Sequence, residues 1–489
     1  MAHMANRREF LGIVGAGAAA AALPRGALGG EAPAAQRPPN FILIFTDDQG
    51  YQDLGCFGSP DIATPCIDKM AAEGTRFTDF HVAAPVCTPS RAALLTGCYP
   101  QRVCLPNVLF PGSKVGISDK ETTLAELLKA RGYATACIGK WHLGHLPQFL
   151  PTRHGFDSYL GIPYSNDMTV DPNMAVADDV AWRDGMTLEK MRKEKPIRHG
   201  VPLFRDEKVI EYPADQTQLT TRYTEEAVKF ITANKEKPFF LYLPHSMPHI
   251  PLFVSDKHKG KSKRGLYGDV IEEIDWSTGQ ILDTVRKLGL AENTCVLFTS
   301  DNGPWLVMKQ NGGSALPLRD GKGTTWEGGM REPCVMWWPG RIPAGKTCAE
   351  FASTLDVLPT FAKLAGAEAP TGRIIDGRDI WPLMAGAPGA KSPTEAFFYY
   401  RSYGLEAVRS GKWKLRLARK AGGGKGKAPR ETPAALYDLD ADISEKNDVA
   451  AANPDVVKRL EDLAERCRED IGDASRGMPG KNRRPCGTA

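Results

Sequence analysis

The sequence predicts an α/β protein with a large, mainly parallel central sheet flanked by helices and a smaller C-terminal unit of antiparallel sheet plus helix. Short apolar runs alternate with helical patterns along residues 40–299. Buried parallel strands form continuous apolar runs, and their connections are usually helical. Beyond residue 390, apolar and polar residues alternate, as in antiparallel strands with one exposed face. The 489 residues also exceed the roughly 300 that one core usually holds.

Four apolar runs are predicted to be strands of the large sheet: residues 40–46, 134–139, 238–243 and 295–299. Helical patterns between them cover residues 123–131, 221–234 and 267–288. Each strand is followed closely by polar residues, which are Asp47 and Asp48, Lys140 and His142, His245 and His249, and Asp301 and Asn302. Ligands of open α/β sheets bind beyond the carboxyl ends of the strands, so we expect these side chains to meet at one site.

The C-terminal unit is expected to begin within the Pro/Gly-rich stretch 387–393. Residues 396–401, 406–409 and 413–417 are predicted strands, and residues 455–471 a closing helix. The Gly/Lys-rich loop 421–428 is expected to be disordered. We therefore expect a large domain over residues 38–389 and a C-terminal subdomain over residues 390–489.

Residues 1–37 are expected to be a targeting segment and linker. Asn6-Arg7-Arg8-Glu9-Phe10-Leu11 precedes an apolar Ala/Gly-rich run, which resembles a twin-arginine export signal. The first four residues, Met1-Ala2-His3-Met4, are interpreted as a remnant of an expression vector. The apolar run is shorter than the ~20 residues that a membrane-spanning helix needs. We expect an exported protein, periplasmic or secreted, with no stable membrane insertion.

Charge and cysteine content exclude some classes of function. The 62 Lys and Arg residues against 58 Asp and Glu residues leave a net charge of +4, so no nucleic-acid partner is expected. The 11 cysteines show no CxxC pair, and no HExxH motif is present, so a zinc site is not expected. Their disulfide pairing stays open.

The segment Val86 to Gly97 holds the most specific motif of the chain. Pro89 stands where the first turn of a helix tolerates proline, so Cys87 is predicted to open a helix. Free backbone N–H groups at such a position attract anions. Arg91 follows at i+4 and shares the same helix face. Taken alone, the pattern also fits a buried or merely reactive cysteine.

Cys87-Thr88-Pro89-Ser90-Arg91 resembles the signature of type I sulfatases, in which the cysteine is converted to formylglycine. Further segments resemble blocks of the same family in the same order: Asp47-Asp48, residues 139–144, residues 161–165, residues 248–251, Asp301-Asn302-Gly303 and residues 321–329. The resemblance is strongest to the arylsulfatase A and N-acetylgalactosamine-6-sulfatase branch. It implies an alkaline phosphatase-like fold, with residues 38–389 as the catalytic domain.

Asp47, Asp48, Asp301 and Asn302 offer only oxygen ligands, which suits a hard cation. A solvated turn or a helix cap is the alternative for an Asp-Asp pair at a strand end. The resemblance implies Ca²⁺ at these four residues and at modified Cys87, with Mg²⁺ as a possible substitute.

The resemblance also implies a mechanism. One hydroxyl of the hydrated formylglycine attacks sulfur to give a sulfo-enzyme, and the aldehyde re-forms as sulfate is expelled. His249, with Lys322, protonates the leaving alcohol, and His142 takes the proton of the second hydroxyl. Arg91 and Lys140 stabilise the charged oxygens. Lys140, Ser165, His249 and Lys322 are expected to bind substrate.

The roles of two residues, Ser165 and His245, have alternative interpretations. Ser165 fits equally a loop serine that caps a turn, and His245 fits a residue that only lines the pocket.

The resemblance also implies partners, because maturation of the cysteine requires a formylglycine-generating enzyme. The substrate is expected to be a small-molecule or glycan sulfate ester, and a sulfated carbohydrate is favoured. The rivals are a phosphonate monoester or phosphodiester hydrolase of the same superfamily, against which Lys322 argues, and a non-catalytic glycan-binding protein with unmodified Cys87.

Overall fold

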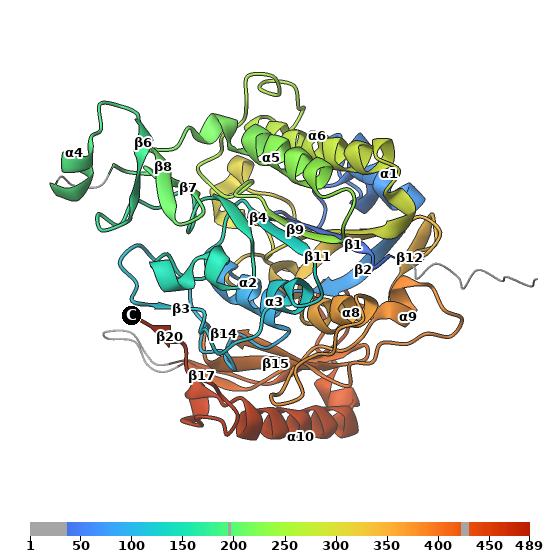
Figure 1. The fold of residues 1–489 in the computed structure, drawn as a ribbon. Coiled ribbons are helices and arrows are strands. Elements are labelled where there is room, and N and C mark those ends of the chain that lie inside the picture. Colours follow the sequence, from blue (N-terminus) through green and yellow to red (C-terminus); the bar gives the residue numbers. More distant parts are fainter. Residues whose placement is uncertain (1–36, 194–196, 422–429) are drawn as a thin grey trace, which may run out of the picture. The chain divides into compact units, whose positions relative to one another are not determined.

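A computed structural model describes residues 37–193, 197–421 and 430–489 (Figure 1). The expected export signal and residues 422–428 of the Gly/Lys-rich loop lie outside this part of the chain. Residues 38–489 form one compact unit. None of its described helices is both long and apolar enough to cross a membrane.

Twelve strands of the described residues form one large sheet. Along its main path the order is β12-β2-β11-β10-β1-β9-β4-β5-β7-β8-β6, and β13 pairs with β2. The bounds are β1 (Asn40–Thr46), β2 (Thr75–His81), β4 (Ala134–Ile138), β5 (Ser158–Gly161), β6 (Val176–Trp182), β7 (Leu203–Arg205), β8 (Lys208–Tyr212), β9 (Phe239–Pro244), β10 (Thr294–Ser300), β11 (Arg331–Trp337), β12 (Lys346–Cys348) and β13 (Ala352–Ser353).

The five central strands β10, β1, β9, β4 and β5 are parallel, and every residue of β1, β9 and β10 is buried. Antiparallel pairs flank them, formed by β11 with β10 and β2 and by β7 with β5 and β8. Thr46 of β1 lies opposite Ser300 of β10, so the acidic residues that follow both strands come level. This register positions the site.

Helices cover both faces of the sheet (Figure 1). One face carries α1 (Pro65–Glu73), α5 (Leu219–Ala233) and α6 (Leu266–Lys287), and the other carries α2 (Cys87–Thr96), α3 (Leu124–Lys129) and α8 (Val357–Leu364). Outside the C-terminal unit, the described residues also form α4 (Leu188–Lys193), α7 (Glu327–Met330) and α9 (Trp381–Met384). All ten residues of α2 are buried, because it lies between the two sheets.

The C-terminal unit is a four-stranded antiparallel sheet of order β14-β15-β16-β19, on which α10 (Pro454–Asp470) packs. Its strands are β14 (Phe397–Arg401), β15 (Gly404–Ser410), β16 (Trp413–Arg416) and β19 (Ala435–Asp438). Two small pairs join β17 (Arg419–Ala421) to β18 (Arg430–Thr432) and β3 (Val115–Gly116) to β20 (Gly487–Thr488). The predicted fold class is thus confirmed.

A buried charge network joins the two sheets. The Glu327 carboxylate of α7 accepts hydrogen bonds from Lys414 Nζ at 2.8 Å, Tyr399 Oη at 2.9 Å and His81 Nε2 at 2.9 Å. Asp79 of β2 accepts two from the Arg409 guanidinium of β15. Although burial opposes ionisation, Lys414 and His81 hold the pKa of Glu327 well below its usual range. The C-terminal sheet is therefore bound to the large sheet by paired buried charges.

Lys414→Met is expected to lower the free energy of unfolding by about 3 kcal/mol, because it leaves the buried carboxylate of Glu327 short of its main cation. The matched control is Lys412→Met on the same hairpin, since Lys412 pairs with Asp438 at the surface. Urea unfolding measures both variants. Equal unfolding midpoints for the two would show that the buried network adds no stability.

Candidate active site

The polar residues that follow the central strands come together at one edge of the large sheet. Asp48 and Asp301, from β1 and β10, are in contact, because the Asp48 N–H donates to Asp301 Oδ1 at 3.2 Å. Asn302 Nδ2 donates to Asp48 Oδ1 at 2.7 Å. Lys140, after β4, donates from Nζ to Asp47 Oδ2 at 2.5 Å. Strand order and register thus gather residues that are far apart in the chain.

Two backbone features hold these strand ends in place. Gly139 has φ 133°, and a Cβ there would lie 1.9 Å from the Pro244 carbonyl oxygen, so only glycine allows this approach of β4 to β9. The Lys140 N–H then donates to that carbonyl at 2.6 Å. Asp48 and His142 adopt left-handed φ values of 65° and 62°, which are costly for residues with a side chain and common at functional sites.

Cys87 is the first residue of α2, as the sequence predicts. Its side chain is 98% hidden from solvent, and its Sγ lies 3.8 Å from Asp47 Oδ1. Burial raises the pKa of the Cys87 thiol to about 12, and the nearby ammonium groups of Lys140 and Lys322 do not offset it. An unmodified Cys87 therefore carries almost no thiolate at neutral pH, and only the thiolate is a good nucleophile.

Each acid of the cluster is paired with a cation that is buried or, in the case of Lys322, partly buried. Arg91 donates from Nε at 3.1 Å and from Nη2 at 2.7 Å to Asp301 Oδ2, and from Nη1 to the Lys140 carbonyl. Lys322 Nζ donates to Asp48 Oδ2 at 2.7 Å. Because three cations converge on buried acids, the site is suited to bind an anion with several charged oxygens.

The same residues fit a divalent metal ion. Ligand atoms of Asp47, Asp48, Cys87 and His249 lie within 4.8 Å of one another. Asn302 Oδ1 is buried without a hydrogen-bond partner, which is the state of an oxygen available to a cation. The carboxyl and amide oxygens around it are the ligands that Ca²⁺ and Mg²⁺ prefer.

The acids also crowd one another. Burial, and then the neighbouring carboxylate of Asp47, raise the pKa of Asp301 to about 7. For Asp47, the cations Lys140, His249 and Arg91 outweigh burial and hold the pKa well below its usual range. A further positive charge would stabilise the ionised form of Asp301.

A second acidic group, Asp79, His81 and Glu327, also places its ligand atoms within 4.8 Å. Arg409 and Lys414 already pair with these carboxylates in the network between the two sheets. This group therefore lacks the excess negative charge that a metal site needs.

The ring of His249 is oriented by acceptors on its Nδ1 side. Nδ1 lies 3.1 Å from Asn166 Oδ1 and 2.6 Å from the Ile250 carbonyl oxygen, so Nδ1 carries a proton. Nε2 then faces the site, 3.7 Å from Asp48 Oδ2. Burial, and next the ammonium of Lys322, lower the pKa of His249. Ser165 Oγ lies between this ring, at 3.3 Å from Nε2, and Lys140 Nζ at 3.2 Å.

His142 is held in the other orientation. Its Nε2–H donates to the Leu109 carbonyl oxygen at 2.9 Å, and its buried Nδ1 has no partner. Burial and the Lys140 ammonium hold the pKa of His142 well below its usual range. The ring is therefore neutral, with its free electron pair on Nδ1.

The structure adds two residues that the sequence analysis missed. Asn166 orients His249, and its own Nδ2 donates to the Pro251 carbonyl at 3.0 Å. The ring of Trp305 lies beside His249 and beneath the Lys322 ammonium. Only their positions, directly after Ser165 and three residues after Asn302, give a signal in the sequence. His245 is fully buried with neither ring nitrogen bonded, and burial lowers its pKa to about 4.

Acids for a metal ion, cations for an anion and two oriented histidines at the edge of a mainly parallel sheet define a hydrolase of anionic esters. Comparison with known proteins shows the family of hydrolases to which the chain belongs. The chain belongs to the sulfatase family: the family model for sulfatase matches residues 39–367, and that for the C-terminal region of aryl-sulfatase matches residues 392–487.

Its relatives include human arylsulfatase A, which is 42% identical over 455 residues and 88% of each chain. The N-acetylgalactosamine-6-sulfatase of dog is 42% identical over 398 residues, covering 78% of this chain and 72% of the relative. Among solved structures, Ps i-CgsB in complex with k-i-k-neocarrahexaose has a TM-score of 0.75 at 33% identity, covering 88% of this chain and 92% of the other. The chain is a sulfuric ester hydrolase.

Proposed function

We propose that this sulfatase hydrolyses sulfate esters of a sulfated carbohydrate, with a formylglycine formed from Cys87 as its nucleophile. The observation that carries the proposal is the place of Cys87, which opens α2 and lies 3.8 Å from Asp47 within a cluster of buried acids and cations. Because its thiol is protonated at neutral pH, another functional group is needed there. Formylglycine supplies a hydrated aldehyde, with one hydroxyl to attack sulfur and a second through which the aldehyde re-forms.

The residues around position 87 bind and polarise the sulfate group. Arg91, Lys140 and Lys322 each bind a carboxylate, and each side chain has further N–H groups that can donate to sulfate oxygens. Charge that develops on those oxygens in the transition state is stabilised by cations already in place. Ser165 Oγ, bonded to Lys140 Nζ, keeps that ammonium directed into the site.

A calcium ion, with magnesium as the substitute, would be held by Asp47, Asp48, Asp301 and Asn302 together with modified residue 87. Such an ion supplies Lewis-acid polarisation of the sulfate and lowers the pKa of a bound hydroxyl. The unpaired Asn302 Oδ1 and the raised pKa of Asp301 support this assignment.

The two histidines divide the proton transfers. His249 holds one proton on Nδ1 towards Asn166 and Ile250, so its charged form presents the second proton from Nε2 to the leaving alcohol. His142, with a free electron pair on Nδ1, accepts the proton of the second hydroxyl of residue 87. One histidine is thus the acid and the other the base.

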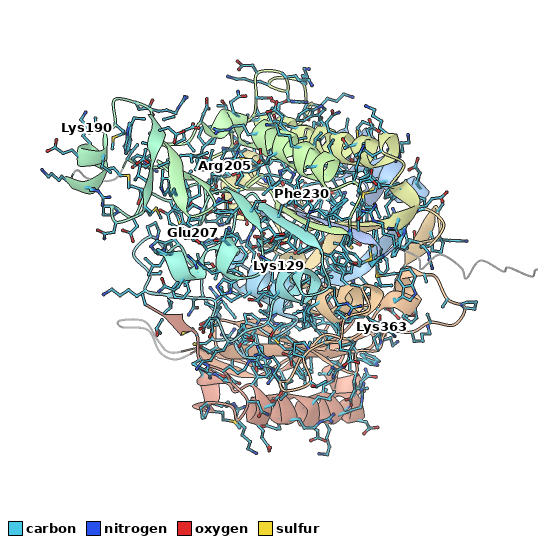
Figure 2. The ribbon with its side chains drawn as sticks, in the orientation of Figure 1. Lys129, Lys190, Arg205, Glu207, Phe230 and Lys363 are labelled. Carbon is cyan, nitrogen blue, oxygen red and sulfur yellow. The ribbon has the colours of Figure 1, made fainter. Side chains whose placement is uncertain are left out.

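The basic segment 190–198 is either a solvated stretch or one that attracts a polyanionic sulfated glycan. Figure 2 shows Lys190 on α4, far from the C-terminal sheet, and Lys190 begins the basic segment 190–198.

Maturation requires a formylglycine-generating enzyme, and we place the mature protein outside the cytoplasm on the basis of the twin-arginine-like segment.

The proposal is tested by peptide mass analysis of residue 87 together with two substrates. In a host that has a formylglycine-generating enzyme, the peptide is expected about 18 Da lighter than its cysteine form, and 4-nitrophenyl sulfate is expected to be cleaved faster than an aryl phosphonate. Turnover by protein with intact Cys87 would contradict the proposed nucleophile, and faster cleavage of the phosphonate would favour the phosphonate hydrolase.

Asn166→Ala is expected to lower kcat by about tenfold or more on an alkyl or sugar sulfate, since general acid catalysis contributes ~10²–10⁴ and Asn166 orients the acid. The loss should be smaller on 4-nitrophenyl sulfate, whose leaving group needs little protonation. Asn173→Ala, an exposed residue of the following loop, is the control. Equal losses on both substrates would indicate that Asn166 serves stability rather than acid catalysis.

A further inference from the structure

Trp305 has no place in the proton transfers, yet its ring adjoins His249, the proposed acid, and Lys322, a cation of the sulfate site. Its ring centroid lies 5.8 Å from that of His249, at an interplanar angle of 47°. The Lys322 ammonium lies over the ring, 4.6 Å from its centroid. The Trp305 side chain is only partly buried, so some of the ring surface faces outward. An aromatic surface therefore adjoins the acid that protonates the leaving group and a cation that binds the sulfate group.

The ring is held on a fixed backbone. The Pro304 carbonyl oxygen accepts hydrogen bonds from the N–H groups of Lys322 at 3.0 Å and Leu306 at 3.1 Å, and the Trp305 carbonyl oxygen accepts one from Met308 at 3.0 Å. Asn302, a proposed metal ligand, stands three residues earlier. Trp305 is thus tied to both the metal-binding strand end and the lysine loop.

More apolar surface continues from Trp305. Leu306 and Val307 are 41% and 70% exposed at the start of the 3-10 helix Leu306–Asn311. Leu306 packs against the loop of Lys322, because a Cβ added at Gly321 would lie 3.0 Å from its Cγ. Single exposed apolar residues are ordinary on protein surfaces. Here Leu306, which packs against the loop of Lys322, continues the surface that begins with the Trp305 ring beside His249.

We propose that Trp305, flanked by Leu306, forms the leaving-group subsite and selects sulfate esters whose alcohol is carried on a ring with an apolar face, such as a pyranose or an aryl ring. This inference rests on the proposed role of His249, because the group that His249 protonates is the one that must lie beside it. An aromatic ring stacks on the C–H face of a sugar or on another aromatic ring, whereas a short alkyl chain offers little surface to it.

The test measures binding apart from turnover, so that failure of the proposed chemistry does not decide it. Calorimetry on the Cys87→Ala protein, loaded with calcium, compares 4-nitrophenyl sulfate and a pyranose sulfate with methyl sulfate. In this background Trp305→Ala is expected to weaken binding of both ring-bearing esters by about tenfold and to leave methyl sulfate unchanged, since an aromatic pair contributes up to about one factor of ten. Trp305→Phe is expected to restore most of the loss.

Val307→Ala is the matched control, since Val307 follows in the same segment and is the more exposed residue. An equal loss for ring-bearing and ringless esters in Trp305→Ala would overturn the subsite and leave Trp305 as a support for Lys322. Unchanged affinity for all three esters would overturn it as well. Turnover by the unsubstituted protein is recorded separately and tests only the proposed nucleophile.

Discussion

Cys87→Ser is expected to lower multiple turnover by about 10⁴-fold or more, the scale seen when a nucleophile is removed. A serine has one hydroxyl, so it can accept the sulfuryl group but has no second hydroxyl with which to expel it. The variant is therefore expected to retain sulfate covalently on residue 87 after a single reaction. Steady-state hydrolysis of an aryl sulfate measures the loss, and intact mass before and after substrate detects the retained sulfate.

The control for this variant is Cys66→Ser, at the start of α1, which lies on the opposite face of the large sheet from α2. It is expected to keep the parent activity. Full multiple turnover by the Cys87→Ser protein would contradict the need for a second hydroxyl, and with it the proposed mechanism.

Removal of divalent metal is expected to have an effect of similar size. Dialysis against a chelator should reduce kcat by at least about 10³-fold, because both the nucleophile and the developing charge depend on the cation. Calcium is expected to restore activity, magnesium to restore part of it, and zinc to be a poor substitute for an oxygen-rich site.

A stability readout accompanies the activity measurement. Saturating calcium is expected to raise the Tm of the metal-free protein, since a ligand that binds only the folded state stabilises it. In Asp301→Asn this rise should be much smaller. If chelation leaves activity and Tm unchanged, then Asp47, Asp48, Asp301 and Asn302 hold no functional ion.

Much of the fold was predictable because its central strands are strongly apolar. The predicted strand over residues 40–46 is β1, and the predicted helix over residues 267–288 is α6, displaced by one residue at each end. In the C-terminal unit, alternation predicted β14 and a helical pattern predicted α10, with errors of one residue. In these segments local sequence and tertiary burial favour the same structure.

The flanks of the large sheet were harder to predict. The strand β2, with sequence TRFTDFH, mixes charges into its length and is completed by pairing with β11 and β12. Its Asp79 and His81 are accommodated only because Arg409 and Glu327, from distant segments, pair with them. A single sequence does not show such compensation, since it depends on which elements meet after folding.

The active site likewise has residues that the sequence predicts and residues that only the structure reveals. The strand-end acids and Cys87 could be singled out because their residue types and positions are unusual, and the structure brings them together. Asn166 and Trp305 could not, because an asparagine in a loop and a tryptophan after a proline are ordinary in sequence. Their importance lies in the partners that the fold gives them, namely His249 and Lys322.

The enclosure of Cys87 also has a consequence for the order of the proposed maturation and folding. Its thiol is packed inside the finished protein, at the start of a helix whose ten residues are all buried between two sheets. An enzyme that oxidises the Cys87 side chain would have no access to it in that state. The proposed conversion of residue 87 would therefore have to precede the docking of α2, while the polypeptide is nascent or still unfolded. Purified protein that has folded with an intact thiol should then resist activation until it is denatured and refolded.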